Sequence, residues 1–232
     1  MLIPSIDLMG GKIVQLVQGS RKELEFDDFE AWARRFSNFP LIQLIDLDAA
    51  MGRDPNAQLI EFFVTRIPCQ VGGGIRSLDA ALRILQLGAK RVILGSALVQ
   101  NGKINIPLAK QFASELGEAS LVFGIDAKAG KIAIRGWREI TEISPMQMIK
   151  ALDPLCSAFL YTHIDTEGLM TGLPLEAIRP LREATSKQLI VAGGIATSAE
   201  VEHLHQLGVD AVVGMALYSG RMTLPDTIPI SK

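Results

Sequence analysis

The sequence is poor in the residues on which several classes of protein depend. It holds two cysteines, Cys69 and Cys156, in apolar surroundings and without CxxC spacing. This usage predicts reduced thiols in the core and a cytoplasmic location. Of its three histidines, His203 and His205 lie two residues apart on an expected helix and cannot share a face. The sequence therefore predicts no metal site.

Neither an excess of one charge nor a long apolar run is present. Lys and Arg number 23 against 25 Asp and Glu, and the net charge is -2, so the chain lacks the basic surface of a nucleic-acid-binding protein. No run reaches the roughly 18 apolar residues of a membrane span. The N-terminus, MLIPSIDLMGG, lacks the charged region and cleavage site of a secretory signal. We expect neither nucleic acid nor membrane as a partner.

What the chain does contain is a regular alternation of short apolar runs and longer amphipathic segments. Strands are expected at 2–7, 41–46, 68–71, 91–94, 121–126, 159–162, 189–192 and 211–214. Helices are expected at roughly 28–36, 56–65, 77–87, 105–116, 144–152, 175–184 and 198–207, with Leu78, Ala81, Leu82 and Leu85 on one buried face. Several strands are continuous apolar runs, which is typical of a parallel sheet covered by helices.

Eight repeats of strand and helix predict an α/β fold, a (β/α)8 TIM barrel. We expect a single domain over residues 1–232, with a short last helix. The Pro-rich tail from Thr223 is expected to be poorly ordered.

One phrase occurs twice, about 120 residues apart. VGGGIRSLDAALRILQLGAK begins at Val71, and VAGGIATSAEVEHLHQLGVD begins at Val191. The strand endings Ile6-Asp7 and Ile125-Asp126 are related by the same kind of offset. We interpret residues 1 to about 118 and 119 to about 220 as two half-barrels of four βα units each. The alternative is the weak self-similarity of any barrel, in which every unit solves the same packing problem.

Two aspartates end strands in corresponding places. Residues at the carboxyl ends of barrel strands face the active site, and half-barrel symmetry puts Asp7 and Asp126 on opposite sides of the mouth. Two facing carboxyl groups can serve as base and acid if their environments differ. The alternative is that each Asp only caps a loop.

The repeated glycines predict two phosphate sites. Gly73-Gly74 and Gly193-Gly194 follow strands three and seven, and Gly95 and Gly214 follow strands four and eight. Consecutive glycines let backbone N–H groups approach an anion closely, and barrels often bind phosphate after strands seven and eight. Two such turns indicate a ligand with a phosphate at each end. Tight strand-to-helix turns are the alternative explanation.

Other polar residues gather near the predicted mouth. Thr162 ends strand six, where its hydroxyl can reach a substrate oxygen or be satisfied within the core. Arg135 and Trp137 lie after strand five, in a loop that either folds over a ligand or forms a surface hairpin. Thr197 begins a capping box and is expected to be structural, and we expect loop bonding for Asp46 and Asp48.

Eight phrases in a fixed order extend these interpretations: IPSIDLMGGKIVQLVQG, LIDLDAA, VGGGIRS, VILGSAL, RGW, THIDTEGLMTG, VAGGIAT and GMALYSG. Together they resemble the phosphoribosylformimino-5-aminoimidazole carboxamide ribotide isomerases, a family of histidine-biosynthesis enzymes, over residues 1 to about 221. The resemblance implies a barrel of two similar halves and an Amadori rearrangement of a bisphosphorylated aminoaldose to an aminoketose. It also implies that no metal or cofactor is needed. We expect a monomer.

The resemblance also implies roles for individual residues. Asp7 would take the proton from the sugar carbon next to the anomeric one, and Asp126 would protonate the ring oxygen. Thr162 would contact the substrate, while Arg135 and Trp137 would belong to a mobile loop that closes on it. Positions in or near the phosphate-binding loops are Gly19, Gly73, Gly74, Gly95, Ser96, Gly172, Gly193, Gly194 and Gly214. Arg76, which Ala196 replaces in the second copy, is a further candidate because it would make the two ends unequal.

Three residues depart from the family pattern. Gln15 stands where the family often has Arg, Glu167 where it has Asp, and Met215 where Lys or Arg is usual. Another reading is the cyclase subunit of imidazole glycerol phosphate synthase, but QGS at 18–20 and RGW at 135–137 favour the isomerase. An isomerase that also converts phosphoribosyl anthranilate stays open. A non-catalytic phosphosugar-binding barrel is disfavoured because it needs neither aspartate.

Overall fold

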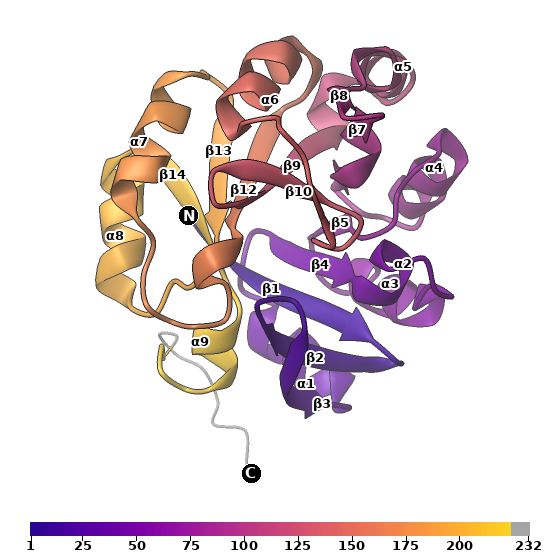
Figure 1. Ribbon diagram of the computed structural model, residues 1–232. Helices are drawn as coiled ribbons and strands as arrows, with labels where there is room; N and C mark the ends of the chain where they lie inside the picture. The colour runs from indigo at the N-terminus through magenta and orange to yellow at the C-terminus, as the bar shows by residue number, and fades with distance from the viewer. Residues whose placement is uncertain (224–232) are drawn as a thin grey trace.

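A computed structural model describes residues 1–223, in which eight parallel strands close into a barrel with helices around it (Figure 1). The barrel strands are β1 (Leu2–Met9), β4 (Ile42–Asp46), β5 (Cys69–Gly72), β6 (Arg91–Leu94), β9 (Leu121–Lys128), β12 (Ala158–His163), β13 (Gln188–Ala192) and β14 (Val209–Val213). Pairing of β6 with β9 and of β14 with β1 closes the ring. The predicted TIM barrel is confirmed. The predicted tail, apart from Thr223, falls outside the described residues.

The outer helices lie where the periodicity predicts them. They are α1 (Phe29–Phe36), α3 (Ala57–Val64), α4 (Leu78–Gln86), α5 (Ile106–Leu116), α6 (Pro145–Leu152), α7 (Leu175–Glu183), α8 (Ser198–Gln206) and the short α9 (Met215–Tyr218). Side-chain caps fix several beginnings, and Thr197 and Glu200 form the expected capping box of α8. The predicted buried face of α4 is partly wrong. Ala81 is fully buried, but Leu82 is 39% exposed because, as the next residue, it is rotated about 100° around the helix axis from Ala81.

Two hairpin extensions adjoin the barrel strands; the first was not predicted, and the second, around residues 135–137, was one of the two alternatives left open for that loop. β2 (Lys12–Val17) folds back antiparallel on β1 and continues into β3 (Arg21–Phe26). β10 (Lys131–Ile134) folds back on β9 in the same way and pairs with β11 (Glu139–Ile140). A short helix, α2 (Leu47–Ala50), follows β4. Both hairpins rise from the strands that carry the two predicted aspartates, so they form walls around the mouth.

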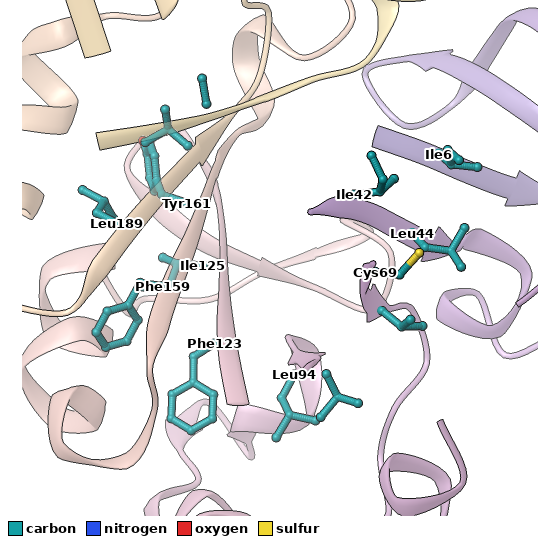
Figure 2. Packing of buried hydrophobic residues seen from close by; sticks show 14 of the residues in the cluster. Ile6, Ile42, Leu44, Cys69, Leu94, Phe123, Ile125, Phe159, Tyr161 and Leu189 are labelled. Carbon is teal, nitrogen blue, oxygen red and sulfur yellow. The ribbon is translucent and has the colours of Figure 1, made fainter. Parts of the chain in front are cut away.

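Alternation along the strands separates two layers of side chains. Residues of one parity, such as Ile6, Leu44 and Phe123, pack outward against the helices, and Figure 2 shows part of this layer. Residues of the other parity point into the barrel. Asp7 and Asp126 have this second parity and lie near the ends of β1 and β9, so both carboxyl groups reach the carboxyl-end mouth.

Both cysteines are free and buried, and burial raises the pKa of each thiol to about 12. Across residues 1–223, no helix combines the length and apolarity needed to cross a membrane.

Candidate active site

A pocket opens at the carboxyl ends of the barrel strands. It brings together most of the residues singled out in the sequence, namely Asp7, Gly19, Gly73, Gly74, Arg76, Gly95, Ser96, Asp126, Trp137, Thr162, Gly193, Gly194 and Gly214. These residues come from segments that extend from the first strand to the last. The fold thus converts scattered motifs into one site.

Asp7 lies on one side of this pocket. Burial raises the pKa of its carboxyl to about 6, and a hydrogen bond partly opposes that effect. The donor is the Ser5 hydroxyl, 3.0 Å from Oδ1 of Asp7. A carboxyl with this pKa is mostly ionised at neutral pH and can still accept a proton readily. Ser5, two residues earlier on the same face of β1, was not singled out in the sequence.

Asp126 lies on the opposite side, because β9 is the fourth strand from β1 in either direction around the ring. Burial raises the pKa of its carboxyl, while hydrogen bonds from Trp137 and Thr162 favour the ionised form. The Trp137 indole nitrogen donates to Oδ2 at 2.9 Å. Thr162 is the register partner of Asp126 on β12. The two aspartates therefore have different surroundings, as an acid and a base require.

A third carboxyl group, Glu167, also lines the pocket. Burial, followed by the negative charges of Asp7 and Asp126, raises the pKa of Glu167 to about 8. It is therefore mainly protonated at neutral pH. The only sequence signal was its departure from the family's Asp, since the charges that act on it come from strands far away in the chain.

The two glycine turns have closely similar backbones. Gly73 and Gly193 have φ of 99° and 117°, and each approaches the end of the preceding barrel strand so closely that a Cβ would lie 2.1–2.4 Å from a carbonyl oxygen. Gly95 and Gly214 have φ/ψ of -114°/-102° and -111°/-96°. Only glycine fits the first pair of positions, and both turns border the pocket.

The first turn carries an arginine that the second lacks. Arg76 borders the pocket, but its guanidinium donates to the carbonyl oxygens of Ala49, Ala50 and Gly74 at 3.0–3.4 Å. It therefore holds α2 against the turn.

Two of the predicted residues are not brought to the pocket wall. Arg135 points its guanidinium at Glu139, with 3.3 Å between Nε and the carboxylate, and is 77% exposed. It lines a neighbouring groove together with Arg76 and Arg138. Gly172 donates its N–H to the Gly194 carbonyl at 3.0 Å, so it supports the second turn from behind.

The loop of residues 135–137 covers part of the mouth. Arg135, Gly136 and Trp137 have positive φ of 55°, 66° and 65°, a conformation that costs non-glycine residues roughly 1–2 kcal/mol each. The Trp137 ring packs over Gly19, where a Cβ would lie 2.5 Å from the indole. The hydroxyl of Ser96 accepts the N–H of Arg135 at 2.8 Å. Contacts with Gly19, Ser96 and Asp126 therefore hold this strained loop in place.

The β2–β3 hairpin and the loop after β12 form one continuous wall. Gln18 donates its backbone N–H to the Glu167 carbonyl at 3.0 Å, and a Cβ on Gly168 would lie 2.5 Å from the Leu16 carbonyl. Gln15 lines the pocket and its Oε1 faces Gly214.

The expected loop bonding of two other aspartates is confirmed. Asp46 accepts hydrogen bonds from Ala49 and Asn56, and Asp48 accepts them from Gly10 and Asn56. Both carboxylates therefore organise the loops between β4 and α3.

Comparison with known proteins agrees with this geometry. A family profile described as "Histidine biosynthesis protein" matches residues 1–223. A relative from Methanocaldococcus jannaschii is 35% identical over 238 residues, which cover 100% of this chain and 99% of the relative. Relatives from Methanosarcina mazei and Methanosarcina acetivorans are 38% and 39% identical, over 98% of this chain and 96% of each relative. All three are named 1-(5-phosphoribosyl)-5-((5-phosphoribosylamino)methylideneamino)imidazole-4-carboxamide isomerase. The chain belongs to the family of histidine biosynthesis proteins.

Proposed function

We propose that the protein is an aldose–ketose isomerase of histidine biosynthesis that converts a bisphosphorylated aminoaldose into the aminoketose by an Amadori rearrangement. The observation that carries the proposal is the placement of Asp7 and Asp126 on opposite sides of one pocket, between two similar glycine turns. The names of the full-length relatives support the same reaction.

Asp126 is the proposed acid and Asp7 the proposed base. Burial raises the pKa of Asp126 above its usual value, so this carboxyl binds a proton more readily and can donate it to the ring oxygen to open the ribose. Asp7, mostly ionised at neutral pH, then removes the proton from the carbon next to the anomeric carbon. Protonation at the anomeric carbon, with loss of the proton from the hydroxyl on the neighbouring carbon, converts the resulting enol to the ketone. The steps break the ring C–O bond and move protons, with no net change of oxidation state in the molecule, so the proposed reaction needs no metal or cofactor.

The substrate is proposed to lie across the mouth with one phosphate at each glycine turn. Backbone N–H groups at Gly73, Gly74 and Gly95 would hold one end, and those at Gly193, Gly194 and Gly214 the other. Because burial and neighbouring charges keep Glu167 mainly protonated, the pocket carries less negative charge against such a ligand.

The remaining candidate residues have supporting roles in this proposal. Thr162 holds Asp126 and contacts the substrate, and Trp137 stacks on its heteroaromatic ring. Arg76 shapes the first turn, Gly172 supports the second, and Arg135 reaches the ligand only if its side chain leaves Glu139. We propose a monomer in the cytoplasm, since one chain supplies every wall of the pocket and both cysteines are free thiols.

Turnover by the purified protein tests the proposal. The protein should convert the bisphosphate aminoaldose without added metal or cofactor, and an absorbance change follows the conversion. Asp7→Asn should lose about 10²- to 10⁴-fold in kcat while still binding the substrate, and Asp79→Asn, exposed on α4 and outside the pocket, is the matched control. Near-normal rates in both Asp7→Asn and Asp126→Asn would contradict the assigned roles. Phosphoribosyl anthranilate in the same assay distinguishes a single-substrate from a dual-substrate isomerase.

A further inference from the structure

The hydroxyl of Ser96 connects the first phosphate turn to the loop that carries Trp137. It accepts the backbone N–H of Arg135 at 2.8 Å. Two residues later, the Trp137 indole donates to Oδ2 of Asp126 at 2.9 Å. We propose that Ser96 is a positioning residue, through which phosphate bound at this turn fixes the orientation of the acid Asp126. The proposal rests on the function proposed above.

The hydrogen-bonding capacity of Ser96 permits both contacts at once. A serine hydroxyl has one donor and two acceptor sites. The bond from Arg135 uses an acceptor site, so the O–H group can donate to a phosphate oxygen. A hydroxyl that donates to an anion becomes a stronger acceptor, because neighbouring hydrogen bonds polarise one another. Phosphate at the turn therefore strengthens the hold on the N–H of Arg135.

The loop depends on such a hold because its backbone is strained. Arg135, Gly136 and Trp137 all have positive φ, and such conformations persist only where the surroundings fix them. Ser96 anchors the first of these residues, and Asp126 with Gly19 anchors the last. Loss of the first anchor lets the loop relax and draws the indole away from the acid.

The position of the indole decides how Asp126 works as an acid. Trp137 donates to Oδ2 and so fixes the orientation of the Asp126 carboxyl in the pocket. Burial raises the pKa of this carboxyl and the Trp137 bond opposes that rise. Without the indole, the pKa rises further, and the carboxyl is both less ordered and a weaker acid.

The coupling is confined to one end of the substrate. Gly95 and Gly214 share nearly the same φ and ψ, so Ser96 and Met215 occupy matched positions. Met215 has no hydroxyl. Phosphate at the second turn therefore has no corresponding route to the acid, and Met215→Ala is a matched control.

Fluorine NMR of the full-length protein labelled with 5-fluorotryptophan tests the coupling without turnover. The two tryptophans give two resonances, and Trp137→Phe assigns them. Inorganic phosphate should shift and narrow the Trp137 resonance of the wild type. At matched phosphate occupancy, measured by calorimetry, Ser96→Ala should abolish this response, Ser96→Thr should restore it, and Met215→Ala should retain it. A wild-type resonance that ignores saturating phosphate, or an unchanged response in Ser96→Ala, overturns the proposal.

Kinetics separate positioning from simple phosphate binding. Ser96→Ala should lower kcat by about 10-fold or more, and the alkaline limb of the kcat profile should move to higher pH, because the pKa of the acid rises. If Ser96 only bound phosphate, Ser96→Ala would raise KM but would leave kcat and the alkaline limb of the pH profile unchanged. That result would contradict the coupling. A Trp137 response without turnover of the bisphosphate would instead refute the proposed function and leave the coupling intact.

Discussion

Asp7 and Glu167 line one pocket, where burial and then the charge of Asp7 raise the pKa of Glu167 to about 8. Burial also raises the pKa of Asp7 to about 6. Each carboxyl thus binds its proton more tightly in the folded chain than in the unfolded chain. Between about pH 4 and pH 8, folding therefore takes up protons at these two carboxyls, and their contribution to the free energy of unfolding falls as the pH rises.

Glu167→Gln should reduce this dependence of stability on pH. The amide mimics the protonated carboxyl and cannot ionise, so its variant should lose less stability between pH 5 and pH 8.5. One pKa unit corresponds to about 1.4 kcal/mol, and a domain of this size shifts its Tm by roughly 2–4 °C per kcal/mol. We expect the variant's Tm to exceed that of the wild type by several degrees at pH 8.5 in thermal unfolding. Glu202 is exposed on α8, so Glu202→Gln should show the same dependence of Tm on pH as the wild type. Parallel curves of Tm against pH for all three proteins would contradict the raised pKa of Glu167.

Ser5→Ala should move the acidic limb of the pH–rate profile. The Ser5 hydroxyl stabilises ionised Asp7, so its removal raises the pKa of the proposed base above about 6. The base works only when ionised. As the pH is lowered, the variant should therefore lose activity at a pH roughly 0.5–1 unit above that at which the wild type loses it. The measurement is kcat/KM from pH 5 to 9. Ser77→Ala removes the cap of α4, far from Asp7, and should lower stability without moving the limb.

Strand parity explains why the two aspartates could be predicted from the sequence. An inward-pointing residue at the end of a parallel strand can only face the mouth, so Asp7 and Asp126 follow from their positions alone. The β2–β3 hairpin could not be predicted in this way. β3 reads RKELEF and is largely exposed, so it lacks the apolar run that marked the barrel strands.

Contacts between distant segments could not be predicted from the sequence either. The Ser96–Arg135 bond joins residues 39 positions apart. The pKa of Glu167 depends on charges on β1 and β9. Such effects arise only once the barrel has closed, because local sequence carries no information on which loops meet across the mouth.

Gly19→Ala should impair catalysis while a matched variant does not. A Cβ at Gly19 would lie 2.5 Å from the Trp137 ring, whereas Gly10, with a similar φ of 60° against 65°, has nothing within 4 Å of its Cβ position. Both substitutions strain the backbone by a similar amount, so their melting temperatures should match. Only Gly19→Ala displaces the indole from Asp126, and it should lower kcat about 10-fold or more if the acid must be held in place. Steady-state kinetics beside thermal unfolding measures both. Equal kcat in the two variants would mean that the acid works without the indole, while a loss confined to Gly19→Ala assigns the defect to the contact with Trp137.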